Sequence, residues 1–232
     1  MNTITRDKEY FSKIKIIRTE LLIWGEENLR KFPWRETSDT YKIAVAEVML
    51  HRTKADQVTD IYEQFILKYP DFESIVKAGR EAIKADLKSL GLFWRADLLY
   101  DMAVEVVEIY GGKLPLDREK LMSMPGVGNY ISAAILCFGY NLPEPVLDTN
   151  TVRVLGRILG LKITDSSRRS KLFYGIMHDL VNFWDPRTVS FALIDFANAV
   201  CIPGEKPRCE ICSLRDICLY YSKVKLLYNF DS

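Results

Sequence analysis

Long apolar runs, strand-like alternation, low-complexity linkers and repeats of solenoid period are all missing or scarce in this sequence. No apolar stretch approaches the length of a membrane span, and the polar N-terminus lacks the apolar core of a signal peptide. The net charge of +1 neither indicates nor excludes a nucleic-acid partner, because phosphate binding depends on local patches. We therefore expect a soluble, intracellular protein without a membrane partner, built as one large or two small domains.

Apolar residues instead recur at helical spacing over most of the 232 residues. Clear examples are Ile14, Ile17, Leu21, Ile43, Val48, Val58, Ile61, Phe65, Leu98, Met102, Val106 and Tyr110. Brief turn signals, such as paired glycines and aromatic–proline steps, separate these stretches. The sequence therefore predicts an all-α fold of about ten helices joined by short turns.

Cysteine is rare, but four of the five cysteines fall within eighteen positions near the C-terminus. Cys201, Cys209, Cys212 and Cys218 are separated by seven, two and five residues. Turn formers and charges fill the first two spacers, so this loop needs a group at its centre to hold it together. The fifth, Cys137, lies in an apolar helix and is expected to be a buried core thiol.

Two groups could occupy this cysteine loop. A four-cysteine zinc site usually has two Cys-x-x-Cys pairs far apart in sequence, whereas closely spaced cysteines are typical of iron–sulfur proteins. The spacing therefore favours one [4Fe–4S] cluster with all four cysteines as ligands, and zinc remains the alternative. Either group requires free thiols and hence a reducing compartment, such as the cytoplasm or nucleoid.

Residues 117–136 predict two short helices joined by a tight turn. Asp117 is a suitable N-cap for the first helix. The backbone amides of Gly126, Val127 and Gly128 are expected to point outward from the start of the second helix, where they would suit one phosphate. Because such a turn is often only a corner between helices, its function depends on the rest of the chain.

The stretch from Phe32 to Cys218 resembles the helix-hairpin-helix DNA glycosylases of the endonuclease III type. The motifs are PWR at 33–35, AEVMLHRT at 46–53, MPGVGNY at 124–130, and VLDTN at 146–150 followed by Arg153. The cysteine set completes the resemblance with one departure, since that family usually has six residues between its first two cysteines and this chain has seven.

The resemblance implies two all-α domains. A six-helix domain with the helix-hairpin-helix would span residues 36–141, and an iron–sulfur cluster domain would combine residues 1–35 and 142–232. The active site would lie in the cleft between them, with the hairpin on one wall and Asp148 on the other.

The resemblance also assigns the carboxylates. A glycosylase flips its nucleotide out of the duplex and then stabilises an oxocarbenium-like sugar as the base leaves. Asp148 would stabilise this sugar, and its position before a helical stretch also suits an N-cap. Glu47 would line the base pocket and either hydrogen-bond the flipped base or deliver a proton. A surface salt bridge is the alternative for Glu47.

Tyr130 occupies the position that decides the chemistry in this family. A lysine there attacks the sugar, forms a Schiff base and cleaves the strand, which a tyrosine cannot do. The resemblance therefore implies an enzyme that removes a base and leaves the strand intact. Tyrosine at this position resembles the thymine glycosylases that act on T opposite G, whereas adenine glycosylases usually carry serine. A half-buried helix aromatic is the plainer alternative.

Five further residues are expected to touch DNA. His51 and Arg52 stand where relatives usually place the glutamine that fills the hole left by the flipped nucleotide, and Arg52 could instead contact phosphate or the orphan guanine. Leu92 takes the place of a wedge beside the orphan base, or else is a core leucine. Lys206 and Arg208, inside the cysteine loop, would meet the DNA backbone.

These residues predict a monofunctional DNA glycosylase that acts, as a monomer, on double-stranded DNA containing a mispaired or damaged base. Thymine or uracil opposite guanine is the expected substrate. The first alternative is an adenine glycosylase acting opposite guanine or oxidised guanine; Glu47 favours it, while Tyr130 and the lack of the extra C-terminal domain of those enzymes disfavour it. The second is a DNA-structure-binding protein without catalysis.

Overall fold

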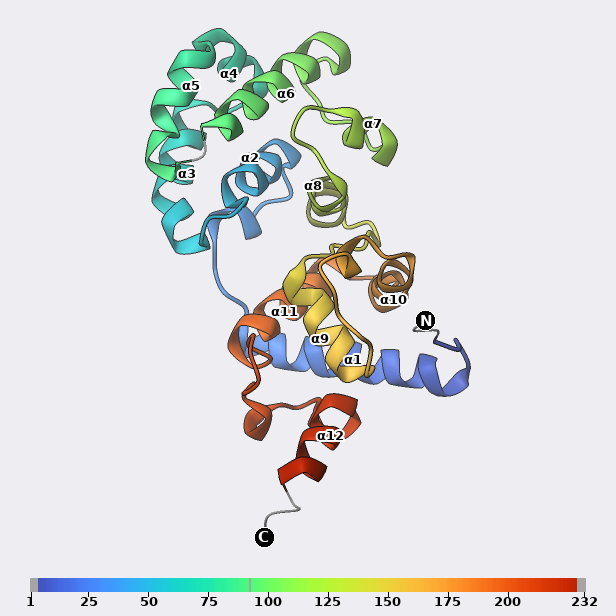
Figure 1. Cartoon of the computed structure of the whole chain (residues 1–232). Helices are drawn as coiled ribbons and strands as arrows, with labels where there is room; N and C mark the ends of the chain where they lie inside the picture. Colours follow the sequence, from blue (N-terminus) through green and yellow to red (C-terminus); the bar gives the residue numbers. More distant parts are fainter. Residues whose placement is uncertain (1–3, 92, 229–232) are drawn as a thin grey trace. The chain divides into compact units, whose positions relative to one another are not determined.

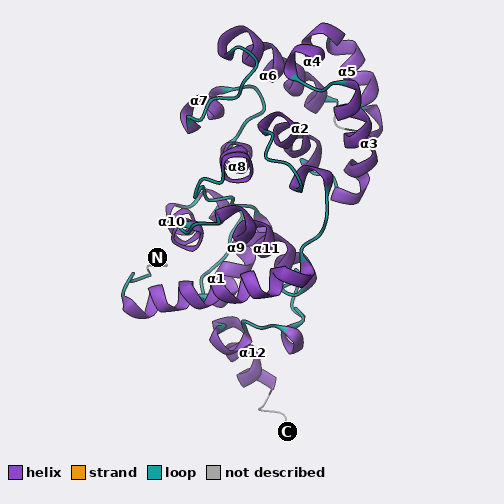
Figure 2. Cartoon of the chain, turned by 180° about the vertical axis from the view of Figure 1, so that it is seen from behind, coloured by secondary structure: helices purple, strands orange, loops and turns teal. Residues whose placement is uncertain are grey.

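The computed structural model describes the backbone of residues 4–91 and 93–228, and in these ranges every regular element is helical (Figures 1 and 2). The prediction of an all-α fold is therefore confirmed. The wedge predicted at Leu92 lies outside the described residues. The chain forms two compact units, one of residues 31–142 and one that combines residues 1–30 with 143–232.

The unit of residues 31–142 is built from short helices around one apolar core. Its α-helices are α2 (Thr40–Leu50), α3 (Ala55–Lys68), α4 (Phe72–Ala78), α5 (Arg80–Asp86), α6 (Trp94–Tyr110), α7 (Arg118–Ser123) and α8 (Asn129–Ala134). The single turns η1 (Pro33–Arg35) and η2 (Lys88–Leu90) are 3₁₀-helical, and the π-helical segment η3 (Ile135–Gly139) continues α8. Helix α2 packs against α3, α6, α8 and η3, so it is the central helix of this unit.

The unit of residues 1–30 and 143–232 surrounds a second core. Its elements are α1 (Lys8–Asn28), α9 (Thr149–Ile158), η4 (Ser167–Arg169), α10 (Lys171–Val181), α11 (Pro186–Ala199), η5 (Cys209–Ile211), η6 (Arg215–Ile217) and α12 (Leu219–Tyr228). The long helix α1 runs beside α11, and α9 packs on both α11 and α12 (Figure 1). The buried carboxylate of Asp195 on α11 accepts hydrogen bonds from the backbone and side chain of Arg30, which attaches the end of α1 to this core.

Aspartates begin many of the helices. An aspartate at the N-cap accepts hydrogen bonds from backbone amides that have no partner inside the helix. The capping aspartates are Asp7, Asp39, Asp71, Asp117, Asp148 and Asp185. This local rule explains why helix starts could be predicted from sequence alone, including the predicted cap at Asp117.

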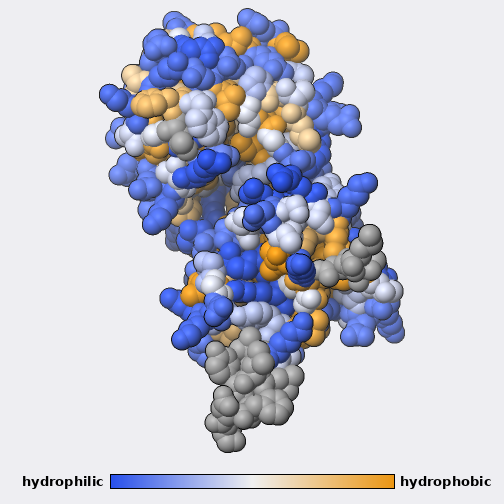
Figure 3. Space-filling model, viewed as in Figure 1, coloured by the Kyte–Doolittle hydropathy of each residue, from blue (hydrophilic) through white to orange (hydrophobic). Residues whose placement is uncertain are grey.

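On the face shown in Figure 3, polar residues cover most of each unit and apolar residues form scattered patches. Among the described helices, none is both long enough and apolar enough to cross a membrane.

Candidate functional site

The helix-hairpin-helix forms as predicted, with α7 and α8 on either side of a tight turn. Gly126 has a φ of 75°, a conformation that residues with a side chain rarely adopt, so the turn requires glycine there. The N–H of Val127 donates to the Met124 carbonyl at 3.1 Å and its side chain is only 4% exposed. The expectation that the Val127 amide faces outward is therefore wrong, because that amide closes the turn itself.

The flanking glycines differ from Val127. Gly126 and Gly128 are both exposed, and no hydrogen bond in the described part of the chain uses their amides. Gly128 is the N-cap of α8, where the positive end of the helix dipole lies. Of the three amides predicted to bind a phosphate, those of Gly126 and Gly128 thus stay candidates and that of Val127 does not.

Glu47 and Tyr130 lie on helices that pack against each other, α2 and α8. Glu47 is 6% exposed within an apolar stretch of α2, so it does not lie at the surface as the salt-bridge alternative required. Tyr130 is the second residue of α8 and is half-buried against the core of the same unit. A carboxylate at so buried a position is costly unless its surroundings or its function require it, which marks Glu47 as a candidate site residue.

Asp148 is the N-cap of α9, as predicted. Its Oδ1 accepts hydrogen bonds from the amides of Asn150 at 2.9 Å and Thr151 at 2.7 Å, while Oδ2 accepts one from the Asn150 side chain at 2.8 Å. The Thr151 hydroxyl completes a capping box with the Asp148 amide. These bonds hold the half-buried carboxylate in one orientation at the start of the helix.

Arg153 links this carboxylate to the cysteine loop, a role that sequence reasoning missed. Its Nη1 donates to Asn150 Oδ1, its Nε to the Cys201 carbonyl and its Nη2 to the Ala197 carbonyl, each at 2.9 Å. In the sequence, Arg153 belongs to one of the quoted motifs. The one signal of its contact with Asn150 is that the two residues lie three positions apart, on one face of a helix. The first cysteine and the Asp148 cap are thus parts of one hydrogen-bonded segment.

The predicted DNA-contacting residues after α2 are exposed. Helix α2 ends at Leu50, His51 is its C-cap, and both His51 and Arg52 reach solvent. Arg52 has a φ of 62°, in the left-handed region that residues other than glycine seldom adopt. Such backbone strain is concentrated at functional positions, so this conformation agrees with a role for the segment in binding.

A second arginine that sequence reasoning missed joins this segment to the start of α6. Arg95 is only 3% exposed, and its guanidinium donates to the carbonyls of Met49, Leu90 and Gly91. The end of α2 and the residues that precede the predicted wedge are therefore held by the same side chain. In the sequence Arg95 looked like an ordinary charged residue near a helix start.

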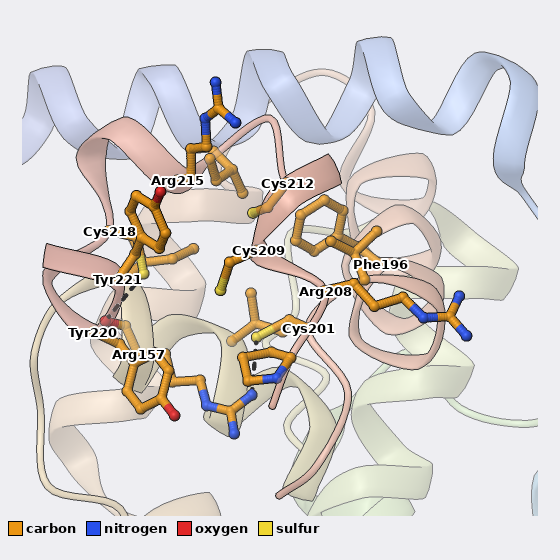
Figure 4. Close-up of a pocket in the computed structure, with 15 residues that line it drawn as sticks. Arg157, Phe196, Cys201, Arg208, Cys209, Cys212, Arg215, Cys218, Tyr220 and Tyr221 are labelled. Carbon is orange, nitrogen blue, oxygen red and sulfur yellow. Dashed lines mark hydrogen bonds between the residues drawn. The ribbon is translucent and has the colours of Figure 1, made fainter. Parts of the chain in front are cut away.

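The four cysteines of the C-terminal loop line one pocket. Their sulfur atoms point into the same space in Figure 4, between α9, α11 and the loop that contains η5 and η6. The space between the lining residues measures about 350 Å³ including the part open to solvent. Its walls include apolar groups, among them Phe196 and Leu214, and the side chain of Arg157.

Burial changes the acid–base behaviour of these thiols. Loss of solvent raises the pKa of Cys212 to about 11, and it also raises the pKa of Cys209 and of Cys218. Thiols in this environment hold their protons at neutral pH unless a cation withdraws negative charge from the sulfur. In the described part of the chain, no three His, Cys, Asp or Glu side chains form a group that could hold one metal ion.

The basic residues of the cysteine loop lie at its surface. Lys206 and Arg208 are exposed, and Arg208 Nη1 donates to the Ala199 carbonyl at 3.2 Å. Arg215 lines the pocket as well but donates to the Glu210 carbonyl at 3.3 Å. Exposed cations at Lys206 and Arg208 are placed as a phosphate-binding surface would require.

Comparison with known proteins connects these features to DNA repair. A family model described as "HhH-GPD superfamily base excision DNA repair protein" matches residues 45–173, more than half of the chain. The chain is 35% identical to a thymine/uracil-DNA glycosylase of Methanothermobacter thermautotrophicus over 91% of its length and 96% of that protein. It is 30% identical to an adenine DNA glycosylase of Mus musculus over 91% of its length and 43% of that protein.

Solved structures show the same fold. A thermostable thymine-DNA glycosylase superimposes with a TM-score of 0.85 at 35% identity, over 91% of this chain and 98% of that one. Endonuclease III in a non-covalent complex with DNA superimposes with a TM-score of 0.77 at 19% identity, over 96% of this chain and 99% of the other. At that lower identity the likeness to endonuclease III concerns the fold alone.

Proposed function

Because the chain belongs to the HhH-GPD superfamily of base excision DNA repair proteins, we propose that it removes thymine or uracil mispaired with guanine from double-stranded DNA. Relatives named for thymine or uracil match it at 33–36% identity over most of their length. In this proposal the protein acts as a monomer in a reducing compartment inside the cell, and it hydrolyses the bond between base and sugar without cutting the strand.

In the proposed reaction, Asp148 acts on the sugar and Glu47 contacts the base that leaves. As the base leaves with the electron pair of the glycosidic bond, positive charge develops on the sugar, and the carboxylate of Asp148 stabilises it until water adds. The capping bonds of Asp148 support this role, since a preoriented carboxylate does not have to reorganise during the reaction. Glu47, on a helix that packs against the hairpin, is assigned to contact the flipped base.

Tyr130 carries the proposal that the enzyme is monofunctional. It stands in the first turn of α8, two residues after Gly128, where strand-cleaving members of the family would place an amine. A phenol cannot form a Schiff base with the sugar, so the abasic product would stay uncut.

The cysteine pocket supports a [4Fe–4S] cluster as the resident cofactor. Cys201, Cys209, Cys212 and Cys218 supply the four thiolates that such a cluster takes, around one space with apolar walls. Their spacing, with one close pair flanked on each side by a single cysteine, favours a cluster over zinc. Hydrolysis of a glycosidic bond transfers no electron, so the cluster would shape and hold the loop rather than react.

Single-turnover cleavage of labelled duplexes tests the substrate. We expect strand breaks at T:G and U:G pairs only after alkali, because alkali cuts the abasic site that the enzyme leaves. Breaks without alkali would contradict the role given to Tyr130. An inactive protein that still binds mismatched duplex would instead support a DNA-structure-binding function.

Adenine removal is the second candidate function. Adenine DNA glycosylases also match the chain, at 29–32% identity, and Glu47 with its motif favours this alternative. Duplexes with adenine opposite guanine or oxidised guanine should therefore be included in the same experiment. Release of adenine but not of thymine would replace the first proposal.

A further inference from the structure

Arg157, in the last turn of α9, reaches into the cysteine pocket (Figure 4). Its Nη1 lies 3.4 Å from the sulfur of Cys201 and 2.7 Å from the carbonyl oxygen of Ile202. Its Nη2 donates to the carbonyl of Gly204. One guanidinium thus contacts the first cysteine and the carbonyls of Ile202 and Gly204 in the loop that follows it.

These contacts fall on the longest of the three spacers between the cysteines. This first spacer, residues 202–208, has seven residues, whereas the other two have two and five. Gly204 has a φ of 88° within it, so the chain takes a turn there that only glycine adopts easily. Ordering a longer spacer costs more conformational entropy than ordering a short one unless contacts offset it.

Tyr220 on α12 contacts the same spacer. The Tyr220 hydroxyl donates to the carbonyl of Glu205 at 3.0 Å, and the Arg157 guanidinium stacks over the Tyr220 ring at 4.9 Å. The Cys218 thiol lies 3.6 Å from the carbonyl oxygen of Arg157. The carbonyls of residues 202, 204 and 205 are therefore held by side chains from two helices that pack against each other.

A guanidinium beside a ligand sulfur also has a chemical effect. It stays protonated in proteins, and its fork of N–H groups binds an anionic acceptor more strongly than a neutral one. The sulfur of Cys201 becomes a thiolate when it binds iron, so the contact with Arg157 is expected to strengthen. Hydrogen bonds to ligand sulfurs also raise the reduction potential of iron–sulfur clusters, since they favour the form with more negative charge.

We propose that Arg157 is a positioning residue of the cluster site, which fixes the seven-residue first spacer and donates to the sulfur of Cys201. This inference rests on the proposed [4Fe–4S] cofactor. Arg215 offers a matched comparison, because it lines the same pocket but donates to the Glu210 carbonyl at the loop surface. Both arginines place a positive charge near the pocket. Of the two, Arg157 is the one that contacts both the spacer carbonyls and the sulfur of Cys201.

The test uses full-length protein purified without oxygen as wild type, Arg157→Ala, Arg157→Lys and Arg215→Ala. Iron and acid-labile sulfide are measured per chain, followed by loss of iron to a chelator and the midpoint potential of the cluster. We expect Arg157→Ala to retain iron about 10- to 100-fold less well, as for other residues that orient metal ligands, and to have a lower potential. Arg157→Lys, which keeps the charge without the fork, should fall between it and wild type.

The outcomes separate the two proposals. Iron retention and potential in Arg157→Ala equal to those of Arg215→Ala would overturn the role of Arg157 while leaving the cluster in place. Wild-type protein that contains zinc, or neither iron nor sulfide, would overturn the cofactor itself. If Arg157→Ala does not fold, as judged by circular dichroism, Arg157→Lys takes its place. Iron retention and potential in Arg157→Lys equal to those of Arg215→Ala would then overturn the role of Arg157.

Discussion

The rings of His51 and Trp94 meet edge to face, with centroids 5.2 Å apart and planes at 84°. His51 follows α2 and Trp94 begins α6, and the buried guanidinium of Arg95 ties these two segments together through their carbonyls. Trp94 is nevertheless 42% exposed, as is common for aromatic side chains at binding surfaces. The pair therefore places a partly exposed aromatic ring on a segment whose backbone is held by Arg95.

We expect Trp94→Ala to weaken binding to DNA that contains an abasic site opposite guanine. Stacking of an unpaired base on an aromatic side chain contributes about 1–3 kcal/mol, so the dissociation constant should rise roughly 5- to 150-fold. Fluorescence anisotropy with a labelled duplex measures it. Ile109→Ala, which removes an exposed apolar side chain from the far end of the same helix, is the control and should bind normally. Equal effects from both variants would show that Trp94 has no particular role.

Tyr130→Lys should create strand-cleaving activity. The substitution introduces an amine in the first turn of α8, at the position where an amine can attack the sugar and form a Schiff base. The measurement is trapping of a protein–DNA adduct with borohydride on a U:G duplex. Tyr130→Phe keeps the ring and supplies no amine, so it should form no adduct. Absence of an adduct with the lysine variant, while base removal continues, would place Tyr130 away from the reacting sugar.

Asp148→Asn should separate catalysis from stability. Asparagine is as good an N-cap as aspartate, so the thermal unfolding temperature should hardly change. Loss of the negative charge should lower the single-turnover rate by about 100-fold or more, as for other preorganised electrostatic groups. Asp117→Asn alters the corresponding cap of α7 and should leave the rate unchanged. A large fall in unfolding temperature without loss of rate would reduce Asp148 to a structural cap.

The stability of the helical unit of residues 31–142 should depend on pH through Asp97. Its carboxylate lies 2.9 Å from Lys84 Nζ and 3.1 Å from Arg80 Nη1, and the hydrogen bond from Lys84, followed by that from Arg80, holds the pKa of Asp97 below its ordinary value. A lowered pKa in the folded state contributes stability above the unfolded value, about 3.9, and this contribution is lost as pH falls through the folded value.

Asp97→Asn should therefore unfold at a lower temperature than wild type between pH 5 and 7 (about one unit or more above the unfolded pKa), and the difference should disappear in more acid solution. Calorimetric scans across this range measure it. Lys84→Gln removes the largest cause of the shift and should reproduce the same pH dependence. A difference that persists unchanged into acid would mean that Asp97 acts through packing rather than charge.

Several features followed directly from the order of residues. Helix starts at Asp117 and Asp148 were predictable because a cap and the amides that it binds lie within three residues of each other. The cysteine loop was predictable for the same reason, since eighteen residues cannot hold four cysteines far apart. The helical periodicity that predicted an all-α fold is local as well.

Tertiary packing decided the features that depend on residues distant in sequence. Arg95 contacts Met49 across 46 positions, Arg153 contacts Cys201 across 48, and Arg157 contacts the same cysteine across 44. In the sequence these arginines resemble any charged helical residue, because nothing near them shows which carbonyl or sulfur they will meet. The burial of Glu47 likewise depends on the helices that surround α2. Local order therefore determines the helices and the spacing of the cysteines, whereas the contacts that hold the site residues in place exist only after distant segments have packed together.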